Sequence, residues 1–160
     1  MKDVRPTSGR VLSALFNILG NIEGAKFLDL FAGTGRVGLE ALERGAESCV
    51  FVESVKSRSD AIKKFSPNSV ILSLEIRRAV SWLVKRGMKF NIIFADPPYN
   101  SGWCGEILML QNLEKLFDED CVFIVEHSSR EKMNINNENF ELISNREYGE
   151  TVLTFLKKIL

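Results

Sequence analysis

The motif Asp96-Pro97-Pro98-Tyr99 joins residue types that could hold the exocyclic amino group of a nucleobase during a reaction. Two successive prolines exclude helix and ladder pairing, so the flanking groups have little freedom left to lose on binding. The Asp96 carboxylate and the Pro97 carbonyl offer acceptors for the two amino hydrogens, which directs the nitrogen lone pair toward a methyl donor. Tyr99 offers a face on which an extruded base could stack. The motif favours amino-group methylation over the plain rigid turn that paired prolines also form.

A glycine-rich loop lies between a predicted strand and a predicted helix, where Gly33, Gly35 and Gly38 form the pattern G-x-G-x-x-G. Glycines permit a tight turn and close approach of a ligand, and the helix start offers free N–H groups. Glu53 ends the next strand, 20 residues after Gly33, where a carboxylate can accept hydrogen bonds from ribose hydroxyls. Together these features predict a nucleoside-bearing cofactor, either NAD or S-adenosylmethionine.

Asp29 begins this loop and helps to distinguish the two cofactors. A carboxylate at this position would repel a pyrophosphate, but it suits a ligand that carries an ammonium and a sulfonium. The alternative is that Asp29 only caps local N–H groups, as aspartate in turns often does. The first interpretation favours S-adenosylmethionine.

The elements expected to position these motifs alternate between strands and helices. Short apolar runs predict strands at 26–31, 48–53, 69–74, 90–95 and 121–126. Helical spacing and stop signals predict helices at 7–20, 36–44, 56–65, 77–86 and 106–117. Strands separated by helices must pair in parallel, so the glycine loop, Glu53 and Asp96 all fall at the carboxyl edge, where open sheets bind ligands. An antiparallel hairpin is predicted at the end of the chain, with strands at 140–147 and 151–158 and Gly149 in the turn between them.

Length and composition indicate one globular domain. The chain has 160 residues, 45% of them hydrophobic and 26% charged. We expect one domain over 1–160, with an amino-terminal helix segment at 1–20, a cofactor-binding core at 26–126 and the hairpin at 140–158. No apolar stretch reaches the roughly 18 residues of a membrane helix, and the start lacks a signal-peptide pattern, so we expect a cytoplasmic protein. Three widely spaced cysteines predict neither a disulfide framework nor a metal site.

Formal net charge is zero, but the charges are unevenly distributed along the chain. Residues 54–90 carry nine basic and two acidic side chains, whereas residues 91–130 carry two basic and seven acidic ones. Such a run is most simply the solvated face of helices. A basic surface for nucleic acid is the alternative.

On these motifs the chain resembles the class I S-adenosylmethionine-dependent methyltransferases, and more narrowly the RsmD family, which methylates the N2 amino group of a guanine in 16S rRNA. The resemblance extends to Arg5-Pro-Thr7, 14–19, 38–42, 44–46 and Tyr148-Gly149. It implies an α/β, Rossmann-like fold with a mostly parallel seven-stranded sheet, a C-terminal antiparallel hairpin and helices on both faces. It also implies action on 16S rRNA or the assembling small ribosomal subunit. We further expect a monomer that needs no metal or membrane.

The resemblance assigns Gly33, Thr34, Gly35 and Glu53 to the cofactor and Asp96 and Tyr99 to the target guanine. The motifs themselves add the remaining residues of the expected site. Those expected to contact S-adenosylmethionine are Asp29, Phe31, Ala32, Gly33, Thr34, Gly35, Gly38 and Glu53. Those expected to hold the target guanine are Asp96, Pro97, Pro98 and Tyr99. Arg5, Arg10 and Arg36 are expected to contact RNA phosphates. The alternatives are an amino methyltransferase of adenine or cytosine in DNA or another RNA, and a non-catalytic RNA-binding or assembly protein that keeps the fold.

Three further features bear on the site. Arg77-Arg78-Ala79 stands where the family usually presents an Asp or Asn to the adenine amino group. His127, the single histidine, is expected to be satisfied by local hydrogen bonds, because this chemistry needs no histidine base. Trp103 lies near the Asp96 motif and is expected either to stack on RNA or to pack within the protein.

Overall fold

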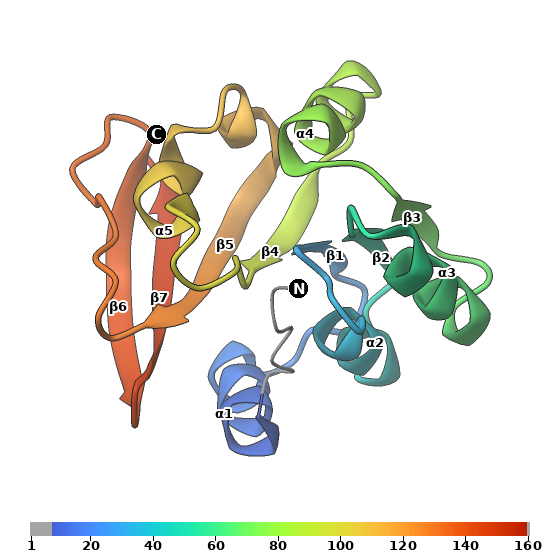
Figure 1. The fold of residues 1–160 in the computed structure, drawn as a ribbon, viewed down its shortest axis with the longest axis horizontal. Helices are drawn as coiled ribbons and strands as arrows, with labels where there is room; N and C mark the ends of the chain where they lie inside the picture. The colour runs from blue at the N-terminus through green and yellow to red at the C-terminus, as the bar shows by residue number, and fades with distance from the viewer. Residues whose placement is uncertain (1–7, 160) are drawn as a thin grey trace.

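The computed structural model describes residues 8–159, which form one seven-stranded sheet in the order β3-β2-β1-β4-β5-β7-β6 (Figure 1). The parallel strands are β1 (Lys26–Leu30), β2 (Ser48–Val52), β3 (Val70–Leu72), β4 (Phe90–Ala95) and β5 (Phe117–Ser128). The hairpin strands are β6 (Phe140–Tyr148) and β7 (Thr151–Lys158), and β7 pairs antiparallel with both β5 and β6. The predicted α/β fold with its C-terminal hairpin is therefore confirmed.

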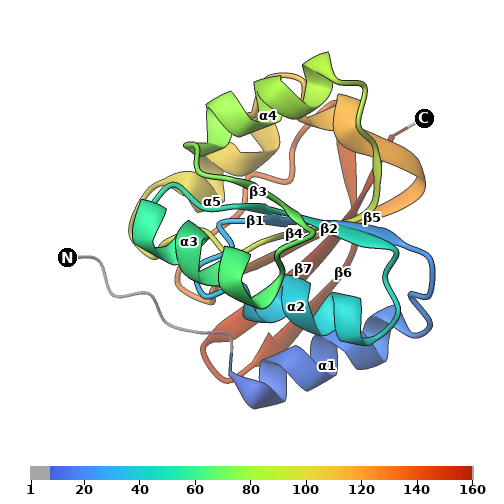
Figure 2. The ribbon, with the colours of Figure 1, turned by 90° about the vertical axis from the view of Figure 1, so that its right-hand side faces the viewer.

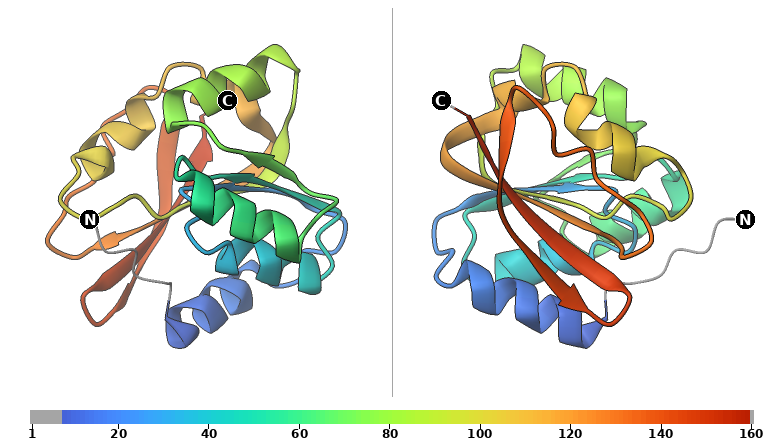
Figure 3. Two further views of the ribbon diagram at one scale, coloured as in Figure 1. Left: turned by 45° about the vertical axis from the view of Figure 1, so that its right-hand side comes forward. Right: turned by 90° about the vertical axis from the view of Figure 1, so that its left-hand side faces the viewer.

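Helices cover both faces of the sheet (Figure 2). One face packs against α1 (Gly9–Leu19), α2 (Arg36–Glu43) and α3 (Lys56–Phe65), and the other against α4 (Ile76–Lys85). A short helix, α5 (Trp103–Glu106), follows β4. Two apolar clusters, one on each face, thus hold the sheet rigid at the edge where the predicted motifs lie. The hairpin forms one end of the sheet (Figure 3), and its residues Leu153 and Phe155 belong to the α1 side of the core.

Local sequence explains how α1 begins and ends. Val11, Leu12, Leu15 and Phe16 are buried at helical spacing. The Ser8 hydroxyl accepts a hydrogen bond from the Val11 N–H at 3.2 Å, so Ser8 caps the start of the helix. Gly20 ends the helix at a φ of +69°, which glycine adopts without strain.

The predicted helix at 106–117 is wrong. The chain forms α5, then two 3₁₀ turns, η1 (Ile107–Met109) and η2 (Leu113–Leu116), which Asn112 separates at a φ of +67°. The buried residues Ile107, Leu110, Leu113 and Leu116 recur every three positions, which matches the period of a 3₁₀ turn rather than an α-helix. Strand β5 also begins four residues before the predicted start, and β3 is shorter than predicted because only three residues pair with β2.

Candidate functional site

A cavity of about 880 Å³ opens at the carboxyl ends of the parallel strands. Its walls come from the connections that follow β1, β2, β3 and β4, together with the ends of β5 and the hairpin. Its volume lies in the range that encloses a drug-sized ligand. Of the predicted cofactor residues, the following line it: Asp29, Phe31, Ala32, Gly33, Thr34 and Glu53. All four residues of the Asp96 motif line the same cavity.

Gly35 and Gly38 are absent from the lining, and they shape the loop instead. Gly35 has a φ of +80° and immediately precedes α2, so it makes the turn into the helix. A Cβ atom on Gly38 would lie 2.4 Å from Phe51 Cε1 and 2.6 Å from Cys49 Sγ. Gly38 therefore allows α2 to lie directly against β2, which brings the helix start to the cavity.

Glu53 fastens the glycine loop to the end of β2. Its Oε1 accepts the Gly33 N–H at 2.9 Å, and its Oε2 accepts the Val55 N–H at 2.8 Å. The side chain is buried, and Arg58 lies 3.9 Å from Oε2. Each carboxylate oxygen can accept a second hydrogen bond, so both remain available to ligand hydroxyls.

Asp29 is 1% exposed and accepts the Gly38 N–H at 3.0 Å, so the local capping that the sequence left open is present. Asp29 also lines the cavity, so the two interpretations do not exclude each other. Burial raises the pKa of the Asp29 carboxyl to about 7; the Gly38 bond lowers that pKa, and the charges of Glu53 and Glu126 raise it. A cationic ligand near this carboxylate would relieve the electrostatic cost of its ionised form.

The Asp96 motif leaves β4 as an extended turn at the cavity wall. Pro97 is buried, whereas Tyr99 is 37% exposed and offers part of its ring to solvent. The Ser101 hydroxyl donates to the Pro98 carbonyl and closes the turn behind the prolines. Burial raises the pKa of the Asp96 carboxyl well above its ordinary value, and the charges of Glu126 and Asp29 raise it further. Asp96 is therefore a stronger proton acceptor than an exposed aspartate.

Trp103 packs within the protein at the cavity wall. Its ring meets the Phe31 ring edge-on at 5.6 Å between centroids, and the Arg77 guanidinium lies 4.5 Å from its centroid. Arg77 is also 3.4 Å from Glu106. Phe31, from the chain after β1, and Arg77, from α4, thus hold the indole as part of the wall, which is the packing alternative for this residue.

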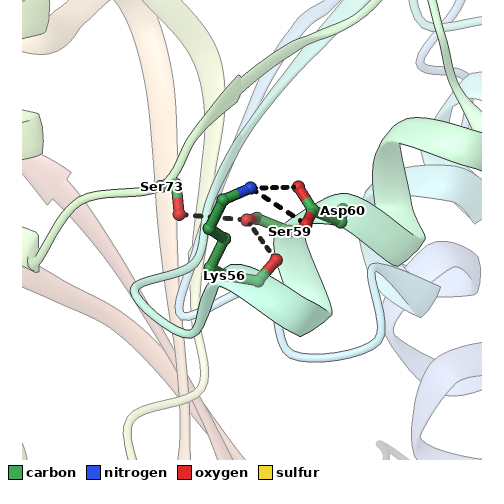
Figure 4. A network of polar contacts seen from close by, with 4 residues as sticks. All are labelled: Lys56, Ser59, Asp60 and Ser73. Atoms are coloured by element: carbon green, nitrogen blue, oxygen red, sulfur yellow. Dashed lines mark hydrogen bonds and ion pairs between the residues drawn. The ribbon is translucent and has the colours of Figure 1, made fainter.

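A small polar network holds the start of α3 to the chain that follows β3 (Figure 4). The Ser59 hydroxyl donates to the Lys56 carbonyl at 2.9 Å and lies 3.0 Å from the Ser73 hydroxyl. Lys56 also pairs with Asp60 across one helical turn, at 3.0 Å. The network fixes the first turn of α3, where Ser57 and Arg58 line the cavity.

The predicted RNA contacts are divided in space. Arg36 lines the cavity, next to Gly9 at the start of α1. Arg10 is exposed on α1 and does not line the cavity. Arg5 lies outside the described residues.

Sequence reasoning missed several parts of the cavity, among them the chain after β3 and one acid in β5. After β3, the lining residues are Leu74, Glu75 and Ile76, which precede the Arg77-Arg78-Ala79 stretch. Glu126 was also missed; it is 4% exposed, lies in β5 and lines the cavity. The signal that could have found Glu126 is the one that found Glu53, an acid at the carboxyl end of an apolar strand segment.

His127 is satisfied locally, as predicted. Its Nδ1 lies 2.9 Å from the Ser128 carbonyl oxygen, and its Nε2 lies 2.7 Å from the Thr154 hydroxyl. Within residues 8–159, no group of His, Cys, Asp and Glu side chains is arranged to hold a metal ion. Over the same residues, no helix has both the length and the apolar character needed to cross a bilayer.

Comparisons with known proteins agree with this fold. The family model described as "Conserved hypothetical protein 95" matches residues 1–157. The "Putative rRNA methyltransferase YlbH" of Bacillus subtilis is 31% identical over 96% of this chain and 88% of its own length. "Ribosomal RNA small subunit methyltransferase D" of Escherichia coli is 36% identical, over 76% of this chain and 63% of its own.

A solved structure has the same architecture over nearly the whole chain. It is titled "Putative methyltransferase yhhF from Escherichia coli", and it superposes with a TM-score of 0.79 at 26% identity. The superposition covers 99% of this chain and 92% of the other. The seven-stranded sheet and its hairpin are thus shared with a class I methyltransferase fold.

Proposed function

Because the chain belongs to the family described as conserved hypothetical protein 95, the RsmD family of methyltransferases, we propose that it methylates the N2 amino group of a guanine in 16S rRNA. The methyl donor is S-adenosylmethionine. The observation that carries the proposal is that Asp96 and Tyr99 line the same cavity as Asp29, Gly33 and Glu53. One cavity therefore combines groups suited to a nucleoside cofactor with groups suited to a nucleobase.

The residues present fit S-adenosylmethionine. Glu53 keeps acceptor capacity for the ribose hydroxyls, and Asp29 presents a buried carboxyl group to a cationic ligand. The glycine loop allows the ligand close to the backbone at the start of α2. When bound, this cofactor supplies a methyl group already activated by its sulfonium, so the protein must mainly bind and orient.

Asp96 and the Pro97 carbonyl hold the two hydrogens of the target amino group. This arrangement points the nitrogen lone pair into the cavity, and the raised pKa of Asp96 suits it to take the proton that the nitrogen releases. The partly exposed Tyr99 ring gives the extruded base a stacking surface. Arg36 at the cavity wall is placed to meet a backbone phosphate.

The small ribosomal subunit is the proposed partner, because the Escherichia coli relative carries that substrate in its name and matches 76% of this chain. We further propose that the protein acts as a monomer in the cytoplasm, where this substrate is assembled. The described residues already contain both halves of the proposed site, so a second copy is not needed to complete it.

The direct test uses labelled S-adenosylmethionine with three substrates: unmodified small subunits, protein-free 16S rRNA, and DNA. We expect label in rRNA as N2-methylguanine, identified by nucleoside mass spectrometry. Asp96→Ala should reduce transfer by at least about 10³-fold, since it removes both the orienting group and the proton acceptor. Its affinity for S-adenosylhomocysteine should stay within about threefold of the wild type.

The other outcomes discriminate among the alternatives. Label in adenine or cytosine of DNA would replace this proposal with DNA amino methylation. Cofactor binding without transfer to any substrate would favour a non-catalytic RNA-binding or assembly protein. An Asp96→Ala protein with normal turnover would refute the role of Asp96.

A further inference from the structure

Glu126 is a buried carboxylic acid in the cavity to which the proposed reaction assigns no role. It lies in β5 and is 4% exposed. In the β4–β5 ladder, Ala95 pairs with Val125, so Asp96 and Glu126 directly follow the last paired residues on neighbouring strands. The two acids therefore lie at the same level of the sheet edge.

Their side chains also leave the sheet on the same face. Residues paired in a parallel ladder share a face, and side chains alternate along each strand. Phe94 pairs with Asp29 in β1 and with Ile124 in β5. Asp96 lies two residues after Phe94, and Glu126 lies two residues after Ile124. Asp29, Asp96 and Glu126 thus project to one side, and all three line the cavity.

This arrangement concentrates negative charge where the base is expected to lie. Burial is the largest cause that raises the pKa of the Asp96 carboxyl. The charge of Glu126 raises this pKa more than the charge of Asp29 does. Carboxylates held this close favour a ligand that brings several N–H donors or a cation. His127, the next residue in β5, alternates to the opposite face and bonds Thr154 and the Ser128 carbonyl.

Guanine differs from the other amino-bearing bases in its donor pattern. Its N1–H lies beside its N2 amino group, so its Watson–Crick edge presents donors side by side. In adenine and cytosine the amino group instead lies beside a ring nitrogen that accepts hydrogen bonds. A second carboxylate next to Asp96 would therefore bind guanine and repel the other two bases, since unpaired buried acceptors are costly.

We propose that Glu126 accepts the N1–H of the target base while Asp96 holds the neighbouring amino group, so that Glu126 makes the enzyme specific for guanine. This inference rests on the proposed function. Glu126 is a specificity residue in this role, and Asp96 orients the reacting nitrogen.

The test replaces the target guanine by 2-aminopurine, which keeps the amino group but has a lone pair in place of the N1–H. Small subunits are reconstituted from semisynthetic 16S rRNA with either base at the position that the wild-type protein methylates. Transfer is measured as kcat/KM for the wild type, for Glu126→Gln, and for the control Glu119→Gln. Glu119 lies on the same strand, exposed and near its other end.

We expect the wild type and Glu119→Gln to prefer guanine over 2-aminopurine by at least about tenfold. The Glu126→Gln amide can donate to the N1 lone pair, so its guanine preference should fall at least about tenfold below that of the wild type. Comparing the two ratios cancels any intrinsic difference in reactivity between the bases. S-adenosylhomocysteine affinity and the unfolding midpoint, measured in parallel, verify that the variant is folded.

Two results would overturn the inference. If Glu126→Gln is folded and keeps the wild-type ratio, Glu126 does not read N1, whereas the proposed function stands. If the wild type transfers no methyl group to guanine N2 in any small subunit, both the proposed function and this inference fail.

Discussion

At the scale of single residues, the site contains a buried acid, Asp29, whose pKa its surroundings raise. Asp29 receives one backbone N–H, from Gly38, and two other carboxylates raise its pKa. The ionised form of such a buried acid lowers stability, a cost that functional sites commonly carry. The cost depends on pH, so it can be measured.

We predict that Asp29→Asn stabilises the ligand-free protein, and more at pH 8 than at pH 5. The folded pKa of about 7 exceeds the ordinary value of 3.8, so the folded state keeps a proton that the unfolded chain releases. The stability that Asp29 contributes therefore falls as pH rises from about 4 to about 7, and asparagine removes this loss. We expect a gain on the order of 1–4 kcal/mol at pH 8, measured by urea unfolding.

The asparagine oxygen can still accept the Gly38 N–H, so the substitution tests charge rather than capping. The same variant should bind S-adenosylmethionine more weakly than the wild type. An equal effect on stability at pH 5 and pH 8 would contradict the buried-charge explanation.

Glu53 supports a second prediction at this scale. Each of its oxygens accepts a backbone N–H, so in Glu53→Gln the amide NH₂ must face either Gly33 or Val55, and both of these donate. We expect S-adenosylhomocysteine affinity to fall by about tenfold or more, as measured by isothermal titration calorimetry. The control Glu47→Gln changes an exposed acid before β2, and an equal loss there would exclude a specific role for Glu53.

At the scale of elements, the contact between α2 and β2 positions the glycine loop. We predict that Gly38→Ala destabilises the protein by about 1–3 kcal/mol, because its Cβ would overlap the rigid Phe51 ring and Cys49. Cofactor affinity should also fall, since a displaced α2 moves the loop. Unfolding by urea measures the first effect and titration calorimetry the second.

Gly105→Ala is the matched control, because a Cβ there meets no atom within 4 Å. Alanine also favours a helix over glycine, so its stability should equal or slightly exceed that of the wild type. If both substitutions cost the same, close packing at Gly38 is not what holds the loop.

At the scale of the whole molecule, the amino-terminal helix α1 lies beside the cavity. Gly9 at its start is next to Arg36, which lines the cavity. Arg10 directly follows Gly9 and is exposed on this helix, so under the proposed function we expect it to contact RNA beside the cavity. We predict that Arg10→Ala weakens small-subunit binding and lowers the slope of log affinity against log salt by about one. Filter binding at several salt concentrations measures the slope.

The control for this prediction is Lys26→Ala, which removes an exposed cation at the amino end of β1, the edge opposite the cavity. Its salt slope should match that of the wild type. A smaller slope for both variants would indicate general charge attraction rather than an interface at the cavity.

The sequence alone was enough to predict Gly33, Glu53 and Asp96 as neighbours, because each lies within three residues after a strand and parallel strands end at one edge. It also predicted the alternation of strands and helices, since apolar runs and helical spacing are local signals. The prediction of a helix at 106–117 was wrong because the spacing of its apolar residues fits both an α-helix and a 3₁₀ turn. Packing against the sheet selected 3₁₀ turns.

Only the tertiary structure decided what depends on strand order and register. Glu126 lies 30 residues from Asp96 in the chain, and only the β4–β5 pairing makes the two acids neighbours. The end of β3 likewise determines which of the following residues reach the cavity. Pairing with β2 ends this strand at Leu72. The physical reason is that local signals determine each element, whereas register is determined by contacts between residues distant in the chain.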